Sequence, residues 1–114
     1  MLNYEKPFQG IATFLKSSTY RDNAKIGFLG VSFDGATSFR PGCRFGPNAI
    51  RQASMMLTDG SHPSFGTYPG YGVTDLGDIN VSNIDVNKSL NQITHYAQNS
   101  PFFQDPSKIA LVAG

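Results

Sequence analysis

Residues 33–45 hold the side chains of this chain that are best suited to chemistry: a carboxylate, a thiol and two guanidinium groups. Asp34 could orient a cationic group or pair with Arg40 or Arg44, and we interpret it as pairing within the segment. Cys43 lies between the two arginines and just before a predicted helix, surroundings that favour a thiolate nucleophile. Such a nucleophile needs a base, and no histidine lies nearby in sequence, so Cys43 is predicted to be an ordinary cysteine.

Three arginines could form an anion site together with the start of the helix predicted near Gly46. Arg40, Arg44 and Arg51 would then bind a phosphate or a carboxylate. The chain has no Gly-x-x-x-x-Gly-Lys-Ser/Thr, and its early glycines lack the Gly-x-Gly-x-x-Gly spacing. We therefore interpret the arginines, together with Thr37, as groups that support the loop; a small anion-binding domain is the alternative.

Asp75 and Asp78 form a second candidate group, because paired carboxylates can act as general acid and general base. They fall in a predicted strand, where positions three apart point to opposite faces. The two carboxylates can converge on one substrate only if a bulge intervenes. We predict a structural role for both at the end of the strand.

The two histidines do not predict a metal site. Neither His62 nor His95 lies two to four residues from a second ligand in a recognisable pattern. His95 also lies off the apolar stripe of its helix, which predicts exposure to solvent. Tyr68 and Tyr71 could line a substrate entrance or a subunit contact, and the sequence does not decide between these.

Alternating apolar segments predict the elements that position these groups. Strands are predicted at residues 25–31, 73–79 and 109–112, helices at residues 47–57 and 84–97, and a turn at residues 98–107. Pro47 suits the first turn of a helix. The expected apolar faces are Ile50, Ala53 and Leu57 on the first helix and Val86, Leu90, Ile93 and Ala97 on the second. The arm formed by residues 1–24 is expected to pack on the core or on a neighbouring subunit, with Ile11, Phe14 and Leu15 on one short helix.

This order of strands and helices predicts an α/β fold with a parallel sheet and right-handed crossovers. Ligands in such sheets bind beyond the carboxyl ends of the strands, which places residues 33–45, here called the rim loop, on the functional edge. The third strand is apolar on both faces and is expected to be central. It ends at a glycine without a following crossover, so we expect the chain to be cut at Gly114.

The composition excludes several classes of protein. Nine basic and eight acidic residues give a net charge of +1, and the absence of a basic run argues against nucleic acid or a membrane surface as a partner. One cysteine cannot form an internal disulfide, and the chain has neither a leader nor a long apolar segment. A cytoplasmic protein is therefore expected.

Residues 26–51 resemble the first strand and loop of the ureohydrolase family, the arginases and agmatinases. The family pattern is Pro-Phe-Asp-x-x-Thr-Ser-x-Arg-x-Gly-x-Arg-x-Gly-Pro-x-Ala-Ile-Arg. The chain matches it at Phe33, Asp34, Thr37, Ser38, Arg40, Gly42, Arg44, Gly46, Pro47, Ala49, Ile50 and Arg51, and has Ser32 in place of the first proline. Residues 75–79 resemble the second strand of the family, and residues 108–114 resemble the strand that leads into Gly-Gly-Asp-His-Ser.

The resemblance implies that residues 25–114 are the amino-terminal β-α-β-α-β part of a three-layer arginase-like fold. It also implies a binuclear manganese enzyme that hydrolyses a small guanidino compound such as agmatine to urea and an amine, commonly as a trimer or hexamer. The family's metal and catalytic motifs would all follow Gly114, so no catalytic, cofactor or metal residue is assigned to this chain, and the 114 residues alone are expected to be inactive. Asp34, Thr37, Arg40, Arg44 and Arg51 are expected to be structural or near the site. The alternative is a non-catalytic interaction or regulatory fragment.

Overall fold

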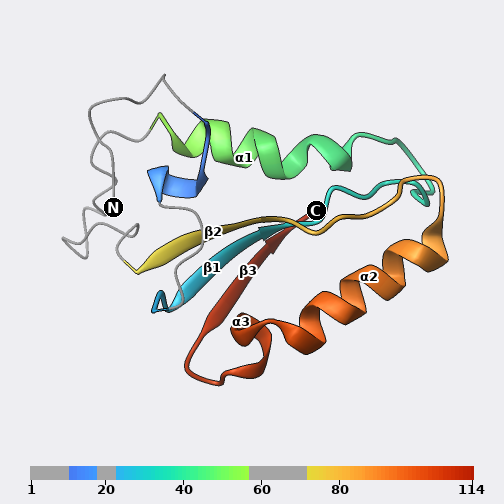
Figure 1. Cartoon of the computed structure of the whole chain (residues 1–114). Helices are drawn as coiled ribbons and strands as arrows, with labels where there is room; N and C mark the ends of the chain where they lie inside the picture. The colour runs from blue at the N-terminus through green and yellow to red at the C-terminus, as the bar shows by residue number, and fades with distance from the viewer. Residues whose placement is uncertain (1–10, 18–22, 57–71) are drawn as a thin grey trace.

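A parallel three-stranded sheet forms the centre of the molecule (Figure 1). The structure, a computed structural model, describes residues 11–17, 23–56 and 72–114. Its elements are η1 (Phe14–Lys16), β1 (Ile26–Gly30), η2 (Cys43–Phe45), α1 (Gly46–Ser54), β2 (Val73–Asp78), α2 (Val86–Asn99), α3 (Pro101–Gln104) and β3 (Ile109–Ala113). Figure 1 shows α1 on one side of the sheet and α2 and α3 on the other. The predicted α/β fold and its strand and helix order are confirmed.

The middle strand is β1, which pairs in parallel with β2 on one side and with β3 on the other. Phe28 and Leu29 of β1 are almost completely buried, and Phe14 of η1 stacks on the Phe28 ring with 4.3 Å between ring centroids. The prediction that the third strand is central is wrong for the described sheet. β3 is an edge strand because, within the described chain, its only partner is β1, and 54% of Val112 is exposed.

Helix α1 buries a different face from the one that its apolar residues predicted. Pro47, Arg51 and Ser54 are buried, whereas Ile50 and Ala53 are exposed. The polar residues Arg51 and Ser54 bond to β2 and η1, and these bonds fix which side of the helix faces the sheet. Leu57, the third residue of the predicted face, lies outside the described residues, as do His62, Tyr68 and Tyr71.

Helix α2 begins at Val86, two residues later than predicted, because the Asp85 side chain caps it by accepting a hydrogen bond from the Lys88 N–H at 3.0 Å. The predicted apolar face is only partly covered: Ile93 and Ala97 are half-buried, but Leu90 is 54% exposed. Within the described chain α2 packs mainly on α3, which leaves that face open.

The turn predicted at residues 98–107 contains a short helix, α3. The sequence does carry the signals for it. Ser100 caps the helix by accepting a hydrogen bond from the Phe102 N–H, and Pro101 occupies the first helical position. Phe102 is buried against the sheet side of the molecule, so this single turn adds a large apolar side chain to the core.

The described part of the arm is a single 3-10 turn, η1, rather than the predicted amphipathic helix. Ile11 is 90% exposed, and Leu15 and Lys16 have φ of 54° and 56°. This left-handed backbone cannot continue an α-helix of L-residues, which is why the apolar stripe does not form. No helix among the described residues is long and apolar enough to cross a membrane.

Candidate functional site

The rim loop follows the carboxyl end of β1 and is organised around the Asp34 carboxylate. Its Oδ2 accepts hydrogen bonds from the backbone N–H of Gly42 at 2.6 Å and of Arg44 at 3.2 Å. Its Oδ1 accepts from Arg44 Nε at 2.7 Å and pairs with Arg44 NH2 at 2.6 Å. The Asp34 carbonyl oxygen accepts from the Thr37 hydroxyl at 3.1 Å. The predicted pairing of Asp34 within the loop is confirmed, with Arg44 as its partner.

The ion pair changes the titration of both residues. The Arg44 guanidinium, bonded to the carboxylate, lowers the pKa of Asp34 to about 2 although burial acts in the opposite direction. The same bond raises the pKa of Arg44 above its usual value. The lowered pKa means that the carboxylate is ionised at neutral pH and can accept the hydrogen bonds from Gly42 and Arg44.

We expect acid to open this loop. The folded pKa of Asp34, about 2, lies below the reference value of 3.8, so the unfolded chain takes up the proton first. The stabilisation by Asp34 is therefore complete above about pH 4 and is lost as the pH falls towards 2. The measurement is the free energy of unfolding against pH for the wild type and for Asp34→Asn, which should differ in slope in this window.

Asp105 provides the internal reference for that comparison. Its pKa is also lowered, chiefly by the hydrogen bond from the Ser107 hydroxyl, and it is present in both proteins. The difference between the two slopes therefore reports Asp34 alone. Parallel curves between about pH 4 and pH 2 would show that the Asp34 carboxylate does not hold the loop closed.

Asn83 joins the rim loop to the segment that follows β2, and no pattern in the sequence pointed to it. Its Oδ1 accepts from the Asp34 N–H at 2.8 Å, and its Nδ2 donates to the Ser32 carbonyl at 3.0 Å. The backbone of Asn83 also lies against Gly35. An asparagine amide both donates and accepts hydrogen bonds, so Asn83 can bind the backbone of the segment that follows β1. These bonds connect the chain after β2 to the chain after β1.

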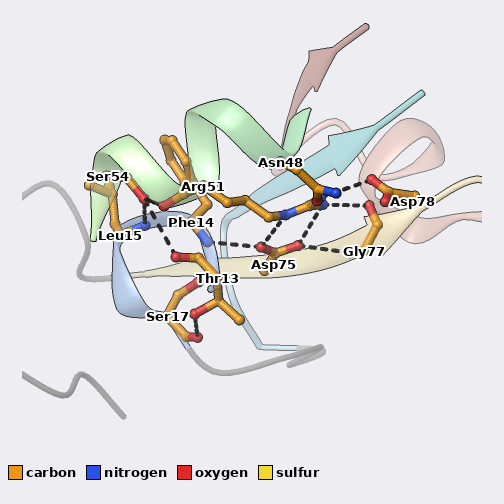
Figure 2. A network of polar contacts seen from close by, with 10 residues as sticks. All are labelled: Thr13, Phe14, Leu15, Ser17, Asn48, Arg51, Ser54, Asp75, Gly77 and Asp78. Carbon is orange, nitrogen blue, oxygen red and sulfur yellow. Dashed lines mark hydrogen bonds and ion pairs between the residues drawn. The ribbon is translucent and has the colours of Figure 1, made fainter. Parts of the chain in front are cut away.

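Below the rim loop, the Arg51 guanidinium connects α1 to β2 (Figure 2). Its Nε and NH2 donate to the two oxygens of Asp75 at 2.8 and 3.0 Å, and its NH1 donates to Asp78 Oδ1 at 2.9 Å. NH2 also donates to the Gly77 carbonyl, and NH1 to Asn48 Oδ1. Burial by itself lowers the pKa of Arg51. The two carboxylates have the larger combined effect and raise this pKa above its usual value.

A β-bulge brings Asp75 and Asp78 to the same guanidinium. The register of the β1–β2 pairing shifts so that Phe28 pairs with Asp75 and Leu29 with Gly77, which leaves Leu76 as the extra residue. Gly77 has φ of 76°, a conformation that glycine adopts without cost. The bulge that the two carboxylates need in order to converge is therefore present. They converge on the guanidinium group of Arg51 and not on a substrate.

The same network fixes η1 against the domain. Asp75 Oδ2 also accepts from the Phe14 N–H at 2.8 Å, and the Ser54 hydroxyl accepts from the Leu15 N–H at 2.9 Å (Figure 2). With the Gly77 N–H on Oδ1, Asp75 accepts four hydrogen bonds, so both of its oxygens are bonded although only 3% of the side chain is exposed. A turn that is far from β2 in sequence is thereby attached to it.

The arrangement supports the rim but does not provide a reactive centre. Arg44 and Arg51 are each bonded to aspartates, whereas Arg40 is exposed and stacks over the Phe39 ring at 5.1 Å, so the three arginines do not converge on an anion. Cys43 is exposed at the start of η2. The described residues contain no group of three or more His, Cys, Asp or Glu placed to hold a metal ion.

A hollow of about 700 Å³ lies along α2, beside the residues that directly follow β2. Asn80, Lys88, Gln92 and His95 are among the residues that line it. His95 is exposed, as its position off the apolar stripe predicted, and accepts a hydrogen bond from Asn99 at its carbonyl oxygen. Because the rim residues do not line this hollow, the two features are separate.

The fold and the rim agree with the resemblance seen in the sequence. A family model described as the arginase family matches residues 24–110 of the 114. The chain belongs to the arginase family. The matched range contains the complete rim loop and the direct partners of Arg51, Asn48, Asp75, Gly77 and Asp78, whereas η1 lies outside it.

Individual arginase-family relatives give the same result. The chain is 38% identical over 89 residues to a guanidinopropionase of Pseudomonas aeruginosa, a match that covers 75% of this chain and 28% of the relative. Among solved structures, a hypothetical agmatinase from Burkholderia thailandensis superposes with a TM-score of 0.78 at 27% identity, covering 93% of this chain and 34% of the other. The proclavaminate amidino hydrolase of Streptomyces clavuligerus gives 0.68 at 29% identity, covering 80% and 32%. The chain thus spans about a third or less of each protein.

Proposed function

We propose that this chain is the amino-terminal part of an agmatinase-like enzyme that hydrolyses a guanidino group and releases urea and an amine. The observation that supports the proposal most is the arginase-family match, because it covers residues 24–110 and includes the whole rim loop. The three relatives are named as a guanidinopropionase, a hypothetical agmatinase and a proclavaminate amidino hydrolase, which agrees with this class of reaction. Agmatine is our first candidate, followed by guanidinobutyrate, guanidine and formiminoglutamate.

We propose that the whole protein uses a binuclear manganese centre, which supplies an activated water at neutral pH in reactions of this kind. The described residues do not fit such a centre. The carboxylates at the rim, Asp34, Asp75 and Asp78, are each bonded to an arginine and are not available as ligands. We therefore place the metal ligands and the catalytic groups in the part of the domain that follows the matched residues.

The role proposed for this part of the protein is to fix the shape of the rim loop. The Asp34–Arg44 pair and the Asn83 amide hold the rim loop, which lies at the carboxyl ends of the strands, where α/β sheets bind ligands. A loop whose shape is fixed before binding loses little conformational entropy when a small substrate binds. We further propose a cytoplasmic homo-oligomer, a trimer or a hexamer, with the arm as one of the contacts.

Two measurements test the proposal. The purified 114-residue chain should release no urea from agmatine, guanidinobutyrate or guanidine, with or without added manganese, because it lacks the ligand set. Metal-dependent turnover by the chain itself would refute this. The residues encoded after Gly114 should contain Gly-Asp-His-Ser followed by Asp-Ala-His-x-Asp, and a gene that ends at Gly114 would favour the non-catalytic alternative.

A further inference from the structure

The η1 turn is attached to the domain in a strained backbone conformation. Leu15 and Lys16 follow one another with φ of 54° and 56°, and both residues are buried. A left-handed conformation is unfavourable for every residue that carries a Cβ, and here the strain occurs twice in succession. Such a backbone persists only where contacts with the surrounding structure hold it.

Two side chains bond to both η1 and Arg51 (Figure 2). Asp75 Oδ2 accepts hydrogen bonds from the Phe14 N–H and from Arg51 Nε, both at 2.8 Å. The Ser54 hydroxyl accepts from the Leu15 N–H at 2.9 Å and donates to the Arg51 carbonyl at 2.7 Å. The bonds that hold the strained turn are therefore made to groups that also bond to Arg51.

An aromatic contact provides a third connection between η1 and Arg51. The Phe28 ring stacks on the Phe14 ring, with 4.3 Å between the centroids and 7° between the planes. Arg51 Cζ lies 5.1 Å from the centroid of the same Phe28 ring. Departure of η1 would therefore uncover the Phe28 ring and remove one donor from Asp75, in both cases next to the Arg51 guanidinium.

We propose that η1 is a releasable strap whose docking is coupled to the Arg51 network. The strain favours release, because the backbone of Leu15 and Lys16 relaxes when the turn leaves. The shared contacts provide the coupling, which acts equally in both directions at equilibrium. A partner that binds η1 only after release would thus weaken the attachment of α1 to β2. The turn lies outside the residues matched by the family model, and the inference does not depend on the proposed reaction.

Amide exchange of the whole 114-residue chain, followed by NMR, tests whether η1 opens separately. The protection factors of the Phe14 and Leu15 amides should be about tenfold or more below that of the Leu29 amide in β1, because η1 opens without unfolding of the sheet. Equal protection at the three amides would mean that η1 opens only when the whole chain unfolds, which would overturn the proposal.

Two replacements of Leu15 isolate the strain. Leu15→Ala and Leu15→Gly both remove the buried side chain, but only glycine adopts the left-handed conformation readily. The Phe14 amide should be protected about threefold better in Leu15→Gly than in Leu15→Ala, even though glycine gives the released chain more freedom. Equal protection in the two variants would contradict a strained strap.

The coupling is measured at the Arg51 guanidinium. Ser54→Ala removes the acceptor of the Leu15 N–H but leaves the side-chain bonds of Arg51 in place, and should speed exchange of the Arg51 Nε–H about fivefold or more. Arg51→Lys should lower the protection of the Phe14 and Leu15 amides by a similar factor. Ser89→Ala is the matched control, because its buried helical hydroxyl bonds to the segment after β2 and not to η1. It should change neither measurement.

Leu15→Ala gives a second route to release that leaves Ser54 intact, and it should speed exchange of the Arg51 Nε–H in the same direction. Faster amide exchange in η1 with an unchanged Arg51 Nε–H in both variants would overturn the coupling. None of these measurements uses urea release, so the proposed function is tested separately.

Discussion

Replacement of Arg51 by methionine is expected to lower the free energy of unfolding by about 3–5 kcal/mol, the range for removing one partner of a buried ion pair. Only 6% of the Arg51 side chain and 3% of the Asp75 side chain are exposed. Methionine fills much of the same volume over the Phe28 ring but supplies no donor to Asp75, Asp78 or the Gly77 carbonyl. The buried Asp75 charge would then lack its cation, and α1 would lose its main bonds to β2.

Denaturant unfolding of Arg51→Met, Arg51→Lys and Arg40→Met measures this effect. Lysine keeps the charge but not the planar fork that bonds both oxygens of Asp75, so Arg51→Lys should lose part of the same stability. Arg40 is exposed and stacks on Phe39. Arg40→Met should therefore stay within about 0.5 kcal/mol of the wild type. Equal stability of the Arg51 and Arg40 methionine variants would show that the network does not hold the fold together.

Replacement of Gly35 by alanine should force the rim loop away from the segment after β2. A Cβ built on Gly35 would lie 2.1 Å from the Asn83 carbonyl oxygen and 3.0 Å from its carbon. Both are backbone atoms, so no side-chain rotation relieves the overlap. We expect a loss of about 1–3 kcal/mol, the usual cost of overpacking, together with loss of the hydrogen bond between the Asp34 N–H and Asn83.

Gly46 provides a matched control in the same part of the chain. Nothing lies within 4 Å of a Cβ placed there, and its φ of −60° and ψ of −52° are helical. Gly46→Ala should therefore stabilise the protein by about 0.4–1 kcal/mol, because it restricts the unfolded chain. Thermal unfolding compares the two variants, and amide exchange at Asp34 follows the loop. If Gly35→Ala were as stable as Gly46→Ala, the two segments would not be in contact.

The Arg51 and Gly35 replacements test two different parts of the structure: the attachment of α1 and η1 to β2, and the shape of the rim loop. The Arg51 network attaches α1 and η1 to β2, below the rim. The Asp34 and Asn83 bonds then shape the backbone at the carboxyl ends of the strands. We expect Gly35→Ala to alter the rim while the sheet stays intact, and Arg51→Met to destabilise the sheet itself.

Local sequence was sufficient to predict the three described strands, the helices α1 and α2, and the pairing of Asp34. Apolar runs bounded by glycine and proline predicted all three strands, because such runs are typical of buried parallel strands. Asp34 and Arg44 lie close together in one short loop, so few alternative partners compete for the carboxylate. The ordered motif of residues 33–51 predicted the arginase family, which the family model confirms.

The helix faces and the position of β3 could not be obtained from the sequence. Apolar spacing predicted that Ile50 and Ala53 face inward, but the bonds of Arg51 and Ser54 turn the other side of α1 to the sheet. Apolar content predicted that β3 is the middle strand, but among the described strands β3 pairs with β1 alone. In both cases, the deciding contacts join residues that are far apart in sequence.

The sequence by itself determined the strands, the loop motif and the family, since each depends on neighbours along the chain. Only the tertiary structure decided what Asp75 and Asp78 do. Residues three apart in a regular strand point to opposite faces, and it took the bulge at Leu76, with Gly77 in a left-handed conformation, to turn both towards Arg51. That bulge appears only when β2 pairs with β1, because a shift of register is a property of two strands together.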